Sequence, residues 1–151
     1  MRIFKRIPKL IRTALLTLSL LIIGLAQTRN DLSHKYGNPS FEVRPNVWMA
    51  AKFTDDGQTC ELIIRERNNC RAGRIFLRSV DGIKELLDEL APKAQRGKFI
   101  NHSAFAADCC DGFTDEYANV TVNFNDQAQL LEGYSYSVLS IRWKNRKCKT
   151  D

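Results

Sequence analysis

Residues 46–67, NVWMAAKFTDDGQTCELIIRER, hold two strand patterns on either side of a turn signal, Asp56-Gly57. An Asp-Gly pair fits the two central positions of a type I′ turn, because glycine takes positive φ without steric cost. This turn sets the register of the two strands. The predicted pairs are Phe53 with Cys60, Ala51 with Leu62, Met49 with Ile64 and, on the other face, Lys52 with Glu61. A chain with this hairpin is expected to build an antiparallel sheet around it.

Residues 79–97 predict an amphipathic helix. Four apolar residues at spacings i, i+3, i+4 and i+7 form one stripe: Ile83, Leu86, Leu87 and Leu90. Ser79 or Asp81 can cap the first turn, and Pro92 weakens or kinks the end. We interpret the stripe as part of the core, with the helix packed on the sheet, rather than as a seam for a partner.

Two more strands are predicted over residues 116–125 and 134–144, joined by a longer turn. Residues 73–79 are either a short extra strand or an extended approach to the helix. The predicted element order is therefore ββ-α-ββ. This order predicts an α+β fold of two layers, in which one main amphipathic helix packs on an antiparallel sheet.

The first 26 residues have the layout of a secretory signal peptide. Five basic residues precede an apolar run over residues 14–25, and the small residues Gly24 and Ala26 follow the pattern of a cleavage site. A membrane-spanning helix needs about 20 apolar residues, so cleavage is favoured. The alternative is an uncleaved anchor over residues 8–26. The predicted location is therefore the periplasm or the secreted fraction.

The charge balance argues against nucleic acid as a partner. The whole chain carries +6, but five of its 23 Lys and Arg residues lie in the first 26 residues, which contain no Asp or Glu. The rest of the chain has 18 basic against 17 acidic residues, a net charge near +1. Without a basic excess, binding to phosphate backbones is not expected. The expected partner is an unknown protein or envelope component, and the membrane is contacted only through an uncleaved leader.

The chain after the leader is long enough for one domain with a modest core. Residues 27–45 contain two prolines and scattered polar groups, and they predict a lead-in segment with little structure. The single domain is then predicted to span residues 46–151.

Two resemblances rest on the hairpin and the helix. Residues 47–91 resemble the hairpin–helix unit in the C-terminal domain of TonB-like periplasmic proteins. A TonB-like or cystatin-like surface implies an exposed strand edge to which a partner adds a strand. EVRPNVWMAAKFTDDGQTCELIIRER followed by KELLDELAPKAQRGK also resembles a set of uncharacterised exported bacterial proteins, which implies no activity, cofactor or site residue.

The five cysteines predict a disulfide framework, because an exported chain folds in an oxidising compartment. They are Cys60, Cys70, Cys109, Cys110 and Cys148. Extending the second hairpin outward brings Cys109 and Cys110 opposite Cys148, so one of the two is expected to bridge to it. We favour Cys110–Cys148, which would close a loop of about 40 residues worth roughly 3–4 kcal/mol. Cys109 is then left to pair with Cys70. Cys60 shares a face with apolar residues and is predicted to be a buried free thiol.

The segment DCCDG at residues 108–112 has two alternatives to a disulfide clamp. A metal site is disfavoured, because zinc sites use spaced thiolates and calcium loops place glycine sixth; no metal or cofactor is predicted. A small thiol-redox or hydrolytic enzyme would use Cys70, or His102 with an acid such as Asp108 or Asp115. The favoured prediction is a non-catalytic binding or structural protein of the envelope or secreted fraction.

Overall fold

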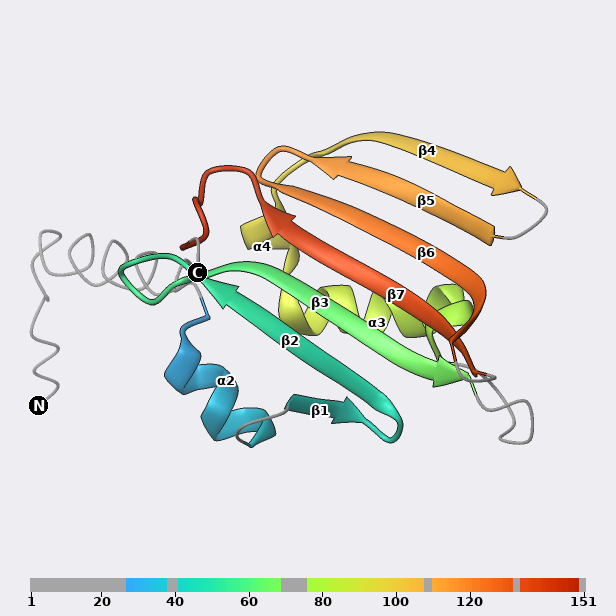
Figure 1. Cartoon of the computed structure of the whole chain (residues 1–151). Helices are drawn as coiled ribbons and strands as arrows, with labels where there is room; N and C mark the ends of the chain where they lie inside the picture. The colour runs from blue at the N-terminus through green and yellow to red at the C-terminus, as the bar shows by residue number, and fades with distance from the viewer. Residues whose placement is uncertain (1–26, 38–40, 69–75, 108–109, 132–133, 150–151) are drawn as a thin grey trace, which may run out of the picture.

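The computed structural model of the protein describes residues 27–37, 41–68, 76–107, 110–131 and 134–149. Figure 1 shows its elements along the chain. They are α2 (Arg29–Tyr36), β1 (Phe41–Arg44), β2 (Val47–Phe53), β3 (Thr59–Asn68), the 3₁₀ helix η2 (Phe76–Arg78), α3 (Val80–Leu90), α4 (Lys93–Arg96), β4 (Phe99–Ala107), β5 (Cys110–Tyr117), β6 (Val120–Leu131) and β7 (Tyr134–Trp143).

The seven described strands form one antiparallel sheet in the order β1-β2-β3-β7-β6-β5-β4. Figure 1 shows α3 behind the middle of this sheet, with β1 at one edge and β4 at the other. The longest of the described helices, α3, has 11 residues. The predicted α+β fold with two layers and a ββ-α-ββ order is therefore wrong, and the described chain has a sheet-rich fold.

The difference comes from β1, β4 and β5, which the sequence did not predict as strands. Along β4, residues 99–106 are all exposed. A strand with no fully buried face carries little alternation of apolar and polar residues, which is the main sequence signal for a strand. Main-chain pairing with β5 holds β4 in the sheet instead.

The core lies between the sheet and α3. The predicted apolar stripe on the helix is confirmed, because all four of its members are buried. The strand residues in the same buried cluster include Leu62, Ile64, Val120, Val122, Leu139 and Ile141. Ser79 caps α3 by accepting the Gly82 N–H at 3.4 Å, and Pro92 separates α3 from α4. Burying one such aliphatic side chain contributes about 1.5–3 kcal/mol.

The hairpin predicted over residues 46–67 is confirmed in most of its register. The observed pairs include Ala51 with Leu62, Met49 with Ile64 and Lys52 with Glu61, whose Nζ and Oε2 atoms lie 2.7 Å apart. The register shifts just before the turn, so Phe53 pairs with Thr59 and not, as predicted, with Cys60. The turn is not the predicted type I′, because the Gly57 N–H donates to the Thr54 carbonyl at 3.0 Å and Asp55 and Asp56 are therefore the central residues. Asp56 does not have the positive φ that type I′ requires, whereas Gly57, which follows the two central residues, has a φ of 80°.

The second predicted hairpin exists as β6 and β7, but its register differs. β6 continues to Leu131, and Asn125 pairs with Val138 rather than with a residue near position 134. The predicted longer turn is therefore mostly strand.

The chain also reverses at Ala118-Asn119, which the sequence analysis treated as the interior of a strand. Residues 110–117 consequently form β5, which pairs with β6 instead of prolonging it. Cys110 pairs with Gln127 in that ladder and does not lie opposite Cys148. The predicted bridge between Cys110 and Cys148 is therefore wrong, because it assumed one continuous strand.

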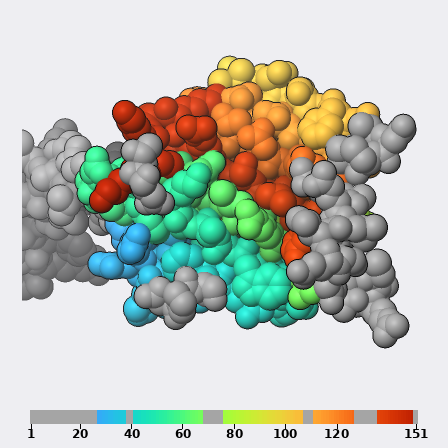
Figure 2. Space-filling model, in the orientation of Figure 1, coloured from blue at the N-terminus to red at the C-terminus, as the bar shows by residue number. Residues whose placement is uncertain are grey.

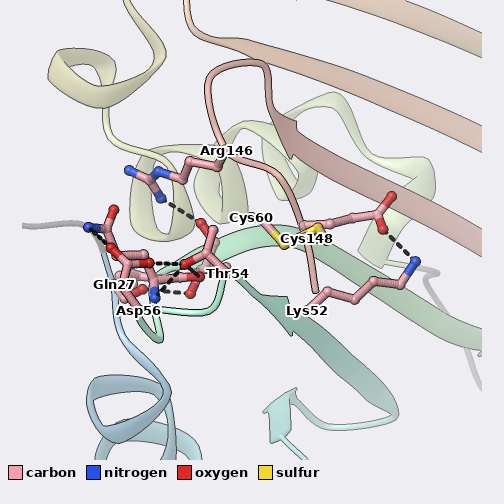
Figure 3. Close-up of a disulfide and its surroundings, with 10 residues drawn as sticks. Gln27, Lys52, Thr54, Asp56, Cys60, Arg146 and Cys148 are labelled. Carbon is pink, nitrogen blue, oxygen red and sulfur yellow. Dashed lines mark hydrogen bonds and ion pairs between the residues drawn. A yellow bond between two sulfur atoms is a disulfide. The ribbon is translucent and has the colours of Figure 1, made fainter. Parts of the chain in front are cut away.

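Cys148 is bonded to Cys60, with 5.5 Å between the two Cα atoms (Figure 3). This separation is usual for a disulfide. After β7 the chain folds back over the first hairpin, where Arg146 Nη1 donates to the Thr59 carbonyl at 2.6 Å. Cys60 is fully buried, as predicted, but the prediction that it is a free thiol is wrong. The C-terminal segment returns to the face of β3 that carries Cys60, and this brings Cys148 to it.

The described part of residues 27–45 is folded, so the prediction of a lead-in with little structure is wrong there. Thr28 and Asp31 form a capping box at the start of α2: the Thr28 hydroxyl accepts the Asp31 N–H, and the Asp31 carboxylate accepts the Thr28 N–H. Leu32 of α2 and Phe41 of β1 are buried in the common core. The folded unit therefore begins before the predicted boundary.

Glu89 of α3 connects the helix to α2 and β1. Its carboxylate lies 2.8 Å from Lys35 Nζ, 2.6 Å from the Tyr36 hydroxyl and 2.6 Å from Arg44 Nη2. Burial raises the pKa of Glu89, but these hydrogen bonds outweigh burial and lower the pKa to about 2, from an ordinary value of 4.5. A carboxylate with a lowered pKa stabilises the fold above its unfolded-state pKa, and this stabilisation is lost as pH falls through the folded-state value.

Glu89→Gln is expected to lower the free energy of unfolding by about 1–2 kcal/mol at neutral pH. The difference from the parent should shrink as pH falls from 4.5 towards 2, because the parent carboxylate then becomes protonated. Urea unfolding followed by tryptophan fluorescence across this range measures the effect. The control is Glu85→Gln, which removes a more exposed partner of Arg44 and should cost below about 1 kcal/mol. A loss in Glu89→Gln that is independent of pH would contradict the prediction.

Candidate functional site

A groove of about 590 Å³ lies between the helices α3 and α4 and the strands β4 and β5. It exists because the sheet is wider than the helix that covers its middle, so β4 and β5 extend past α3 (Figure 1). Its volume is in the range of sites for small molecules, about 300–1,000 Å³. Its apolar lining consists of Val80, Ile83 and Leu87 from α3 and Phe99, Phe113 and Tyr117 from the strands.

Strand alternation places Phe113, Asp115 and Tyr117 of β5 on the groove face. The Phe113 ring contacts the core ring of Phe124 at 5.4 Å between centroids, and Phe99 meets Tyr117 edge to face at 5.5 Å. Phe99 nevertheless remains 48% exposed. The aromatic wall is therefore held from the core side and open on the groove side.

His102 and Asp115 form the polar pair of this wall. They occupy paired positions on β4 and β5, and His102 Nδ1 lies 2.5 Å from Asp115 Oδ1. Because an ionised carboxylate only accepts hydrogen bonds, Nδ1 carries the proton and donates it. In the neutral imidazole this leaves Nε2 as an acceptor. The His102 ring also lies 5.7 Å from the Phe113 ring, which orients it within the apolar wall.

Arg96 lies at the α4 end of the groove. Its side chain is buried because the guanidinium pairs with Asp88 and lies 5.2 Å from the centroid of the Tyr117 ring. Lys84 and Lys93 also line the groove. Since Lys84 belongs to the first half of α3, the α4 end carries two cationic side chains, Arg96 and Lys93, against the carboxylate of Asp88, and it favours a carbonyl or acidic group over a cationic one.

The structure brings together one pair of the predicted catalytic candidates, His102 and Asp115. Cys70, Asp108 and Cys109 lie outside the described residues, so the Cys70–Cys109 bridge and a thiol enzyme based on Cys70 stay predictions. None of the described residues that line the groove is a serine, threonine or cysteine. The described part of the site thus offers a proton acceptor without a hydroxyl or thiol of these types beside it.

The aromatic residues of the wall and Arg96 were not predicted from the sequence. The available signal was the run FTDEY at residues 113–117, in which Phe113 and Tyr117 share one face with Asp115. A strand whose acid lies on the same face as two aromatic residues differs from a solvated face, on which polar residues would be expected throughout. Arg96 had no such signal, since its burial depends on contacts with α3 and β5.

Comparison with protein-family models, curated proteins and solved structures found no match to this chain. The resemblances to TonB-like domains and to exported proteins of unknown function therefore gain no support from these comparisons. Among the described residues, no helix is long and apolar enough to cross a membrane. Within the same part of the chain, no group of three or more His, Cys, Asp or Glu side chains is placed to hold a metal ion.

Proposed function

We propose that this protein is an exported binding protein that holds a small, mainly apolar molecule in the groove between α3–α4 and β4–β5. The observation that carries this proposal is the aromatic and aliphatic lining of a groove of about 590 Å³. Pockets for small molecules typically combine such a lining with a few placed polar groups.

Exposed apolar side chains at the groove support an occupant. Val80 is 82% exposed and Phe99 is 48% exposed, and both line the groove. Covering apolar surface is favourable by roughly 25 cal/mol per Å². A flat aromatic molecule could cover the Phe99 ring and the apolar surface of α3 at once.

The polar groups narrow the chemical class of the ligand. Nε2 of His102 favours a ligand that donates one hydrogen bond, such as a hydroxyl or an aromatic N–H group. The cationic end around Arg96 and Lys93 disfavours a positively charged ligand. The expected ligand is therefore neutral or weakly acidic, mostly apolar, and bears a single donor.

Binding is favoured over hydrolysis by the composition of the lining. The His102–Asp115 pair has the arrangement of a general base and its orienting acid. Covalent hydrolysis also needs a nucleophile within hydrogen-bond reach of the base. The described lining provides no serine, threonine or cysteine for that role.

Export is supported by two independent features. The first 26 residues have the layout of a signal peptide. The Cys60–Cys148 disulfide fits an oxidising compartment, since such bonds persist mainly outside the cytosol.

Phe99→Ala is expected to weaken binding of the probe 1-N-phenylnaphthylamine about tenfold, because one aromatic face worth about 1.5 kcal/mol is removed. This probe is apolar, neutral and carries one N–H group. Its fluorescence on titration with the purified protein measures the dissociation constant. The matched control is Phe105→Ala on the same strand: Phe105 has nearly the same exposure, 46%, but is not part of the groove lining.

The proposed function requires that the probe bind the parent and Phe105→Ala equally well. Equal weakening by Phe99→Ala and Phe105→Ala would place the probe on the β4 edge and contradict the groove. Absence of saturable binding to the parent would contradict it as well.

A further inference from the structure

The two edges of the sheet are built differently. β1 is four residues long and lies beside α2, with which it shares the core residues Leu32 and Phe41. β4 is nine residues long, and no described strand pairs with its outer side. Figure 2 shows the β4 atoms, in yellow, forming the upper rim of the molecule. β4 is therefore the open edge of the described sheet.

Beyond its first residues, where the register shifts between Phe99 and Asn101, β4 lacks the charges and prolines that usually protect an open edge from another strand. Its sequence, FINHSAFAA, contains no lysine, arginine, acid or proline. Three large apolar side chains are exposed along it: Phe99 at 48%, Ile100 at 62% and Phe105 at 46%. Long, exposed, uncharged and apolar edges are the ones to which a further strand adds.

We propose that a second copy of this chain pairs with β4, antiparallel to it, around a two-fold axis at Ser103. Such a contact is isologous, because the same strand is used by both copies. It would join two seven-stranded sheets into one continuous sheet.

The pattern of side-chain sizes along β4 favours a second copy as the partner. With Ser103 facing itself, His102 faces Ala104 of the second copy, and Asn101 faces Phe105 of the second copy. In these two pairs, a larger side chain lies opposite a smaller one: His102 opposite Ala104, and Phe105 opposite Asn101. No pair places like charges opposite each other. Antiparallel neighbours at these positions have Cβ atoms about 4.5–5.5 Å apart, where such complementarity matters.

Pairing at this edge would also extend the groove. His102 lies on the groove face of β4, next to the outer edge. Ala104 of the second copy would lie beside it on the same face, because paired residues share a face. The small side chain leaves His102 accessible while the added strand lengthens the groove floor.

A charge-swap experiment tests the proposal. Ser103 is exposed on the face away from the groove, so a long side chain fits there without disturbing the core. Ser103→Lys and Ser103→Glu should each weaken self-association at least about tenfold, because each places a like charge opposite itself across the axis. An equimolar mixture of the two variants should restore dimers. Size-exclusion chromatography with light scattering measures the mass of each sample.

The control is Asn123→Lys, which adds the same charge on the same face of the sheet but on β6, away from the edge. It should remain as dimeric as the parent. A monomeric parent, or a mixture of Ser103→Lys and Ser103→Glu that stays monomeric, would overturn the proposal. Ser103 lies outside the groove lining, so failure here leaves the proposed ligand site standing.

Discussion

Cys148→Ser is expected to lower the free energy of unfolding by about 4–5 kcal/mol. The bond that it removes joins residues 88 positions apart. Breaking the bond frees this long loop in the unfolded chain, and the chain-entropy model relates the stabilisation to loop length. A shift of this size is a large share of the stability of a small domain, about 5–15 kcal/mol.

Cys148 is the better of the two cysteines to replace first. Cys60 is fully buried, so serine there would also bury a hydroxyl group, whereas Cys148 is half-buried. Urea unfolding of the oxidised protein measures the loss. Lys147→Ser, an exposed neighbour, is the matched control and should stay within about 0.5 kcal/mol of the parent.

The disulfide assignment has a direct competitor in the bridge first predicted from the sequence. If Cys110 were the partner of Cys148, Cys110→Ser would lose as much stability as Cys148→Ser, and Cys60→Ser would not. The structure predicts the opposite: Cys60→Ser, and not Cys110→Ser, should show the loss of stability that comes from breaking this bond. Cys60→Ser and the double variant Cys60→Ser, Cys148→Ser should lose a similar amount of stability, since both remove the same bond.

The elements predicted correctly from the sequence are those that bury one face fully. The hairpin of β2 and β3 alternates because one of its faces meets the core, and Asp56-Gly57 marks its turn. The α3 stripe has helical spacing for the same reason. In both elements, the local sequence pattern and the burial in the folded protein agree, so the pattern predicts the element correctly.

The predictions that failed depend on where the chain reverses. The predicted alternation of side chains along β3 is correct at Cys60, which is buried on the core face. The reversal at Ala118-Asn119 carries no glycine or proline, so the sequence predicts a continuous strand there. One missed reversal moved Cys110 to another strand and changed its predicted partner. Pairing between distant cysteines thus depends on the whole topology, which a local sequence pattern does not determine.

The candidate site was predictable only in its residue types. His102 and Asp115 were named among several possible partners, and the ladder between β4 and β5 selects this pair. The groove itself arises because seven strands are wider than one helix of 11 residues. No stretch of sequence encodes that mismatch of widths.

Glu66 is an acid at one of the alternating β3 positions that otherwise carry apolar residues. An acid at such a position is expected to have a structural role. Counting by twos from Cys60 through Leu62 and Ile64 places Glu66 on the core face, where it is only 6% exposed. Its carboxylate accepts the backbone N–H groups of Phe76 at 2.8 Å and Leu77 at 2.6 Å. It thereby fixes the start of η2, the element that leads into α3.

Glu66→Ala is expected to lower the free energy of unfolding by about 3 kcal/mol, because two N–H groups lose a charged acceptor and the Leu77 N–H is buried. Glu66→Gln keeps one acceptor oxygen and should lose about half as much. The control is Glu61→Ala on the same strand, whose surface ion pair with Lys52 is worth below about 1 kcal/mol. Hydrogen exchange gives a local measure: the Phe76 and Leu77 amides should lose protection in Glu66→Ala and keep it in Glu61→Ala. Equal losses in these two alanine variants, with both amides still protected, would show that Glu66 does not hold η2 on the sheet.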